Sequence, residues 1–400
     1  MLMQGINYLI PFLVIPLIIN KLSLETYGIV ALAQGIMVLF TSLADFGFNL
    51  TGTRLISQRA RDNADLISQI FSIKVLLLSA GFLLLIMMAS LIKKWNSHFD
   101  IILLSYAITV GQGLFPVWYF QGTQKMDSML VLSAGSRIAY LAGIIIWIRE
   151  PSEALYVNLL NGGSWIIVSL IAWTWIVKKE GKIKFSVTRG TFEMIKNNWK
   201  IFASNLAGDA YRASGLILAG FFLPAIGLGL YGLFDKVIML IQNVFIAAYR
   251  GLFPAIAAMA KSNDRMGIAN TYRSYYKRFG SLMFPGILLL LFFGDEVLYW
   301  LSEDITENVR HHLLIISLIP LFFFLSVPLT VNLVAFDRKK AYLIYNMTTA
   351  LVFIGLGSFA AALLGMEGLL LSHSVALFCT VATGYHFNKK DRLPLGRPGR

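Results

Sequence analysis

The chain has 400 residues, of which 57% are hydrophobic and only 14% are charged, and its mean hydropathy is +0.69. Soluble domains carry about 25% charged residues, so the composition excludes an ordinary soluble protein and favours several membrane-spanning helices. The net charge of +13 is interpreted as the basic bias of cytoplasmic loops, so no nucleic-acid partner is expected.

The first apolar segment, MLMQGINYLIPFLVIPLIIN, opens the chain. It lacks a basic region and a small-residue cleavage site, so it is interpreted as an uncleaved first span and not as a signal peptide. Because it starts abruptly, we expect the natural start to lie a few residues upstream.

Twelve apolar segments are long enough to cross a bilayer, which takes about 20 residues as a helix. They lie at 4–20, 28–51, 66–92, 101–121, 128–148, 154–177, 201–222, 228–256, 279–301, 313–335, 341–364 and 368–387. The sequence therefore predicts an all-α integral membrane protein with about 12 transmembrane helices. An even number of spans places both termini on the same side.

The loops differ in charge according to the side they face. The loops on the side of the two termini hold 24 Lys and Arg residues, whereas those on the other side hold 5. By the positive-inside rule, the first set and both termini are predicted to be cytoplasmic. The loops of the other set are all short.

The only sizeable hydrophilic segment, 178–200, divides the apolar segments into two groups of six. The sequence predicts an N-terminal lobe at 1–177, a C-terminal lobe at 201–387 and a cytoplasmic tail at 388–400. The segment between the lobes is basic, and we expect it to be a cytoplasmic linker that contacts anionic membrane lipids.

The two predicted lobes resemble each other at one point. LETYGIVAL at 24–32 and LGLYGLFDK at 228–236 both place Tyr-Gly after a short outer turn, with Tyr27 and Tyr231 204 residues apart. Two six-helix lobes with the same orientation are related by a pseudo-two-fold axis along the membrane normal, which is typical of transporters.

Span 7 carries polar residues on one helix face. Asn205, Gly208, Asp209 and Arg212 are spaced i, i+3, i+4 and i+7. Arg212 lies about 17 Å from the start of the span, near the middle of a core about 30 Å thick. The face is interpreted either as the polar wall of a central cavity or as a structural Asp209–Arg212 pair that neutralises itself.

Three more basic residues lie deep within predicted spans, namely Lys74, Arg137 and Lys236, whereas Arg250 lies near the cytoplasmic end of its span and could reach the headgroups. Charged groups in spans usually face a bundle interior or a wet cavity, so these three are assigned to the same substrate cavity. Its positive bias suits an anionic ligand, because arginine can bind a phosphate through two parallel hydrogen bonds. Asp209 and His373 are candidates for ion coupling, and the alternative for His373 is a hydrogen-bonded histidine that only packs.

The stretch FPVWYFQGTQKM at 115–126 closes span 4. Pro116 is expected to loosen the last turns of the helix. The three rings of Trp118, Tyr119 and Phe120 are interpreted as an aromatic belt at the cytoplasmic membrane surface.

Enzyme signatures are absent from the sequence. There is no G-x-x-x-x-G-K-[ST], G-x-S-x-G or H-E-x-x-H motif and no Cys/His metal cluster. We therefore expect no enzyme activity, no cofactor and no bound metal. Uphill transport would need an ion gradient or the gradient of the substrate.

Three motifs carry a resemblance to a known family. They are LADFGFNLTGTRLISQRARD (43–62), PVWYFQGTQKM (116–126) and NNWKIFASNLAGDAYRASGLILAGFFLPAIGLGLYGLFDKV (197–237). The chain resembles the Wzx-like O-antigen and polysaccharide flippases of the MOP (multidrug/oligosaccharidyl-lipid/polysaccharide) superfamily. Asp209 and Arg212 lie where the family fixes no residue, so they are expected to tune this member.

The resemblance implies translocation of an undecaprenyl-pyrophosphate-linked oligosaccharide across the bacterial inner membrane, from the cytoplasmic to the periplasmic leaflet. It implies alternating access of two lobes, coupled to an inward cation flow, and contact with the polymerase and chain-length regulator of the same pathway. It also makes the end of span 4 an access path for the sugar. The residues assigned to this path are Trp118, Tyr119, Gln121, Gln124, Asp45 and Arg54.

Two other functions compete with this one. A multidrug/cation antiporter of the same superfamily would favour an acidic cavity, whereas the intramembrane charges here are net basic. A membrane polysaccharide polymerase would carry a large extracytoplasmic loop with clustered charges, and the longest outer loop, 302–312, is short.

Overall fold

The computed structural model describes residues 13–58, 63–301 and 309–394. Over these ranges the chain is helical, with short connections and no strand. It divides into two compact units, the first ending at Ala213 and the second beginning at Ser214. Each unit is described in turn.

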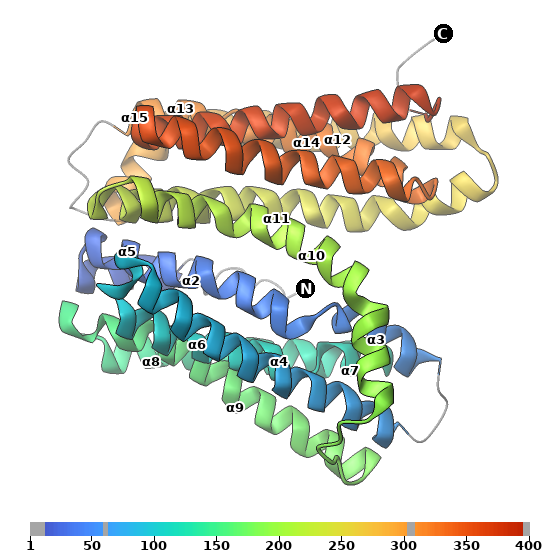
Figure 1. The fold of residues 1–400 in the computed structure, drawn as a ribbon. Coiled ribbons are helices and arrows are strands. Elements are labelled where there is room, and N and C mark those ends of the chain that lie inside the picture. Colours follow the sequence, from blue (N-terminus) through green and yellow to red (C-terminus); the bar gives the residue numbers. More distant parts are fainter. Residues whose placement is uncertain (1–12, 59–62, 302–308, 395–400) are drawn as a thin grey trace. The chain divides into compact units, whose positions relative to one another are not determined.

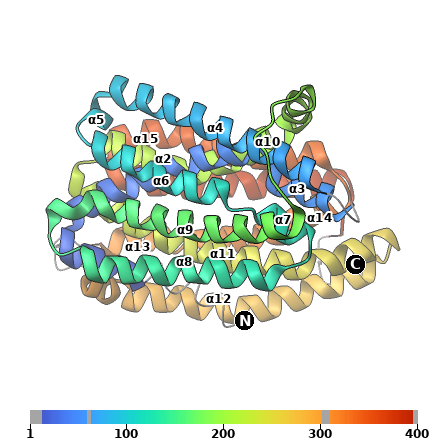
Figure 2. The ribbon, with the colours of Figure 1, turned by 90° about the horizontal axis from the view of Figure 1, so that it is seen from below.

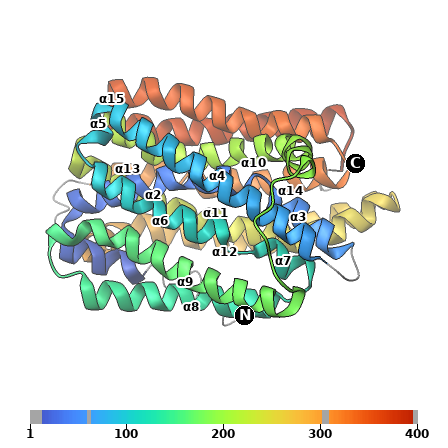
Figure 3. The same ribbon diagram turned by 60° about the horizontal axis from the view of Figure 1, so that its bottom comes forward.

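The helices of the first unit alternate between long spans and short pieces that follow a break. They are a helix at Leu13–Leu22, α2 (Leu24–Asp45), α3 (Phe48–Ser57), α4 (Ala64–Leu91), α5 (Lys93–Asn96), α6 (Phe99–Leu114), α7 (Val117–Gly122), α8 (Met126–Trp147), a 3-10 turn (Pro151–Glu153), α9 (Ala154–Glu180) and the start of α10 (Arg189–Phe222). Helices α6 and α9 lie side by side (Figures 2 and 3). Gly162 permits this close approach, because a Cβ there would overlap the backbone of Ala107.

The second unit contains the end of α10 and five more helices. They are α11 (Ala225–Lys261), α12 (Arg265–Leu301), α13 (Arg310–Ile316), α14 (Ile319–Ala335) and α15 (Lys339–Lys390). Helix α15 folds back on itself at Gly365, whose φ is 58°. Its two arms run antiparallel (Figure 1), with Thr349 Oγ1 2.7 Å from Thr380 Oγ1.

Nine helices of the described chain are long and apolar enough to cross a membrane, so this is a multi-pass membrane protein. One of the nine is α15, which holds two predicted spans because it turns back at Gly365. Helix α10 and the short apolar helix Leu13–Leu22 lie at two further predicted spans. The predicted first span, 4–20, falls largely outside the described residues.

Two predicted spans are interrupted near their predicted cytoplasmic ends. Span 28–51 breaks between α2 and α3, where Phe46 and Gly47 have φ values of 47° and 79°. This left-handed backbone favours glycine. Span 101–121 breaks between α6 and α7 at Pro116, which confirms the expected loosening. The broken ends pack together, with a Cβ at Gly52 of α3 only 3.2 Å from the Trp118 side chain.

The predicted linker is only partly a linker. Residues 181–188 are extended, but α10 begins at Arg189, well before the predicted start of span 7 at 201. The extended part is held against α4, because the Ser186 amide donates to Ser72 Oγ at 2.8 Å. The first turns of α10 are fixed to the first unit by Asn198, whose Nδ2 donates to Thr51 Oγ1 at 3.0 Å.

An asparagine network joins three helices of the second unit. Asn332 of α14 accepts a hydrogen bond from the Tyr272 hydroxyl at 2.6 Å and donates to Asn388 Oδ1 at 2.9 Å. It also donates to the Pro394 carbonyl at 2.7 Å. Because buried polar groups are costly without partners, this network fixes how α12, α14 and α15 meet.

Candidate functional site

The structure brings Asp45 and Lys74 together inside the first unit. Lys74 Nζ donates to Asp45 Oδ1 at 3.2 Å and to the Gly113 carbonyl at 3.0 Å. The Lys74 side chain is 1% exposed and that of Asp45 is 16% exposed. The backbone amide of Asn49 also donates to Asp45 Oδ1, at 3.2 Å. Lys74 therefore ties α2, α4 and α6 together, and its charge is neutralised within the unit.

The Gly113 carbonyl is available because α6 is interrupted. Proline lacks an N–H and cannot continue the helical hydrogen-bond ladder. Beyond Pro116, the Val117 amide donates to the Phe115 carbonyl instead of the Gly113 carbonyl. The lysine thus supplies a donor to a backbone group that the helix break has released.

The polar face of α10 carries an ion pair and open space. The Arg212 guanidinium donates to Asp209 Oδ1, and the two side chains are 49% and 21% exposed. Asn205 is half-buried on the same face. No heavy atom lies within 4 Å of the position a Cβ would take on Gly208. The structural pair of Asp209 and Arg212 therefore forms. The two side chains also remain accessible, as the polar wall of a cavity requires.

Arg137 of α8 carries a charge that no acidic side chain of the described ranges neutralises. Its guanidinium carbon lies 5.5 Å from the centroid of the Trp165 ring on α9. Its Nε is buried without a hydrogen-bond partner in the described chain, as are Trp165 Nε1 and Asn161 Oδ1 one turn away. This group of polar atoms keeps hydrogen-bonding capacity for a ligand or water.

The other two predicted residues belong to the second unit. Lys236 lies on α11 and is half-buried. His373 is buried on the second arm of α15, with its ring centroid 4.8 Å from that of Phe353.

The prediction of an aromatic belt at 118–120 is wrong, because all three rings are buried inside the first unit. The Tyr119 hydroxyl donates to Glu180 Oε1 at 2.7 Å, and the Trp118 ring packs against Gly52. Rings that are covered in this way cannot contact a passing sugar directly. In this structure Trp118 and Tyr119 therefore support the α3–α7 contact.

The remaining residues of the predicted access path lie nearer the surface. Arg54 on α3 and Gln124 after α7 are exposed, and Gln124 adopts a left-handed φ of 57°. Gln121 is half-buried and accepts a hydrogen bond from Thr53 Oγ1 at 3.3 Å.

Sequence reasoning missed a buried polar network around Asn158. Its Nδ2 donates to Ser105 Oγ at 2.8 Å and to the Val30 carbonyl at 3.1 Å, and its Oδ1 accepts from Gln34 Nε2 at 2.9 Å. The signal was available, because Gln34 and Asn158 are amides inside long apolar segments. The network joins α2, α6 and α9.

Two curated relatives align with most of the chain. "Putative O-antigen transporter" of Escherichia coli (strain K12) is 26% identical over 390 residues, which cover 92% of each chain. "Putative O-antigen transporter" of Shigella dysenteriae is 27% identical over 326 residues, covering 77% of this chain and 79% of the relative.

Solved structures share the fold at low sequence identity. A multidrug resistance MATE family transporter of the MOP superfamily, in an inward-facing conformation, superimposes with a TM-score of 0.76 at 14% identity, covering 99% of this chain and 96% of that one. The lipid II flippase MurJ, in an inward closed conformation, gives 0.74 at 13% identity, with 99% and 89% covered. These likenesses confirm the predicted all-α membrane fold of about 12 spans in two lobes.

The profile of one protein family matches residues 1–260, which is more than half of the chain. The match runs across all three motifs on which the resemblance was based, and it confirms that resemblance. The chain belongs to the polysaccharide biosynthesis protein family.

Proposed function

We propose that the chain is a flippase for a lipid-linked oligosaccharide, an O-antigen or related repeat unit carried on undecaprenyl pyrophosphate. The observation that carries this proposal is the alignment of 92% of the chain with a relative described as an O-antigen transporter. The folds shared with a lipid II flippase and with a multidrug transporter favour neither this function nor the antiporter alternative, because 13–14% identity carries no information on substrate.

The substrate moves from the cytoplasmic to the periplasmic leaflet of the bacterial inner membrane by alternating access of the two lobes. Both termini lie in the cytoplasm in this proposal, in agreement with the 24-to-5 distribution of basic loop residues. The polymerase and chain-length regulator of the same pathway are the proposed protein partners.

The pyrophosphate is bound by two arginines that keep an exposed or unused hydrogen-bond donor. Arg212 is half-exposed beside the open space at Gly208, and Arg137 has an unused buried donor. Asn205, on the same face of α10, completes the proposed cavity in the first unit, and Lys236 is a separate candidate in the second unit. Lys74 is assigned a structural role instead, because its side chain is buried and bonded to Asp45 and Gly113.

Cation coupling acts through the Asp209–Arg212 pair in this proposal. A proton or metal cation that binds the Asp209 carboxylate weakens its attraction for Arg212. The guanidinium is then free to make two parallel hydrogen bonds to a phosphate. When the cation leaves, the pair forms again and the substrate is displaced. His373 is the second candidate for coupling.

The function is tested in a strain that lacks its O-antigen flippase. Expression of the protein is expected to restore surface polysaccharide and to clear lipid-linked repeat units from the inner leaflet. If the units stay on the inner leaflet at normal expression, in a strain that makes the matching glycan, the proposal is wrong.

The site is tested by a matched pair of variants on one helix. Arg212→Ala is expected to reduce export strongly, whereas Arg189→Ala, which removes an exposed i,i+4 pair with Glu193, is expected to have no effect. Asp209→Asn is expected to abolish the dependence of transport on the cation gradient in proteoliposomes. Equal export by both arginine variants, at equal expression, would argue against the cavity.

A further inference from the structure

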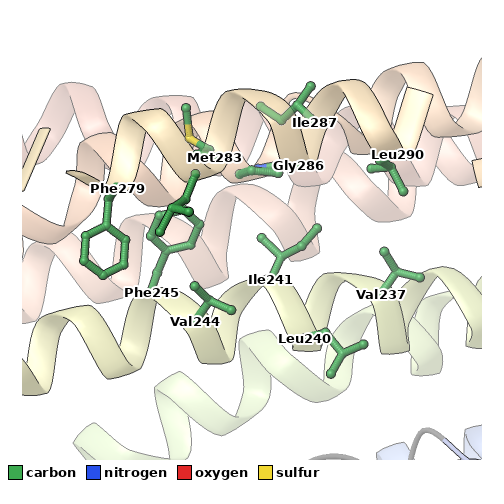
Figure 4. A pocket seen from close by; sticks show the side chains of 12 residues that line it. Val237, Leu240, Ile241, Val244, Phe245, Phe279, Met283, Gly286, Ile287 and Leu290 are labelled. Carbon is green, nitrogen blue, oxygen red and sulfur yellow. The ribbon is translucent and has the colours of Figure 1, made fainter. Parts of the chain in front are cut away.

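A narrow apolar groove lies within the second unit. It runs between residues 237–245 of α11 and 279–290 of α12, with Pro320 of α14, and has a volume of about 370 Å³ (Figure 4). All the side chains that line it are apolar. Phe245, Phe279 and Met283 lie toward one end, and Val237 and Leu290 lie toward the other.

The length and lining of the groove suit an extended apolar chain. Phe279 and Leu290 are eleven residues apart on α12, which corresponds to a length of about 16 Å. All the lining along this length is apolar.

The groove is open along part of its wall. Leu282 is 72% exposed, and no heavy atom lies within 4 Å of the position a Cβ would take on Gly286. Pro285 precedes this glycine inside α12. A Cβ atom added at 286, a residue that lines the groove, would therefore meet no other side chain of the described protein.

The charges at one end of the groove are all positive. Lys277 and Arg278 directly precede Phe279 on α12, and Arg250 lies five residues beyond Phe245 on α11; all three are exposed. Neither α11 after Asp235 nor α12 before Asp295 contains an acidic residue. In the described part of the chain no acidic side chain pairs with these three cations. This end faces the predicted cytoplasmic side.

We propose that the groove binds the apolar chain of the lipid-linked substrate while its phosphate groups contact Arg250, Lys277 and Arg278. This inference rests on the proposed function and adds a second contact, for the lipid and not for the sugar. An apolar groove with cations beyond one end is complementary to a lipid with an apolar chain and an anionic head. The groove holds the lipid in the cytoplasmic leaflet while the glycan occupies the cavity.

The test uses the full-length protein in nanodiscs of phosphatidylcholine with a photoactivatable undecaprenyl phosphate. Peptide mapping is expected to place the crosslink on α11 and α12. Gly286→Phe is expected to lower the yield at least about tenfold, because that factor corresponds to the burial of only about two methylene groups. The control Gly355→Phe adds the same ring at a glycine of α15 that also has open space, and it should leave the yield unchanged.

Three outcomes would overturn the inference. The first is a crosslink outside the groove, and the second is an equal loss of crosslink yield in both glycine variants. The third is full competition by added phosphatidylglycerol, which would make the groove a site for ordinary phospholipid. Replacement of Lys277 and Arg278 by alanine provides a second measurement that does not fill the groove, and retention of the probe by this variant would also count against it. Restoration of surface polysaccharide by the wild-type protein is scored separately, so that failure of the groove and failure of the flippase function are distinguishable.

Discussion

Replacement of Lys74 by methionine is expected to destabilise the first unit strongly. The side chain keeps its length, but Asp45 is left with only the Asn49 amide, and the Gly113 carbonyl loses its lysine donor. Removal of one member of a buried ion pair costs about 3–5 kcal/mol. Asp45 is 16% exposed, so we expect the lower end, about 3 kcal/mol.

The assay is thermal unfolding of the purified protein in detergent, followed by tryptophan fluorescence. For a unit of about 200 residues, 3 kcal/mol corresponds to a fall in Tm of roughly 6–12 °C. The control Lys93→Met removes an exposed lysine and should change stability by less than about 0.5 kcal/mol. In the double variant with Asp45→Asn, the two effects should be less than additive by about 1–3 kcal/mol. Equal Tm values for Lys74→Met and Lys93→Met, or strict additivity, would refute this reasoning.

Three further predictions concern packing, hydrogen bonding and pH. Gly162→Ala should lower stability by about 1–3 kcal/mol, because its methyl group meets the backbone of α6. Gly163→Ala has open space around the added methyl group and should be neutral or stabilising by up to about 1 kcal/mol. Equal Tm values for the two variants would contradict this prediction. Asn332→Leu should lower the free energy of unfolding by at least about 2 kcal/mol, because its hydrogen-bond partners are left unsatisfied. The control Asn346→Leu should not have this effect. The Tm values of the two variants measure the difference. Burial lowers the pKa of His98, so its contribution to the free energy of unfolding is complete above pH 6.5 and declines as the pH falls below that value. His98→Gln should therefore reduce the fall in Tm between pH 7.5 and 5.5. An unchanged fall in Tm would exclude His98 as its source.

Hydropathy predicts the bounds of a span best where the helix is continuous and charged residues flank its ends. Spans 66–92 and 154–177 correspond closely to α4 (Ala64–Leu91) and α9 (Ala154–Glu180). The break at Phe46 escapes such reasoning, because the mean hydropathy of a window does not register one left-handed residue. The start of α10 at Arg189 was also missed, since a basic amphipathic turn that packs against a lobe has the composition of a linker.

The candidate site was predictable in its residue types but not in its pairings. The sequence identifies Asp45 and Lys74 as charges within spans, yet they are 29 residues apart and on different helices. Their contact depends on how α2 and α4 pack, and the second acceptor of Lys74 is a backbone carbonyl that only a broken helix offers. The Asp209–Arg212 pair was predictable because both residues lie on one helix face.

Helix α10 gives the covalent connection between the two units an unusual mechanical character. It runs without interruption from Arg189 to Phe222, across the boundary at Ala213, and its first turns are fixed to the first unit through Asn198. A flexible tether would resist reorientation of the units only through its entropy. A helix resists bending elastically, so a change of angle between the units is stored as curvature, most readily near Gly208 and Gly215, where helix propensity is lowest. The connection therefore opposes any change of angle between the units by elastic strain.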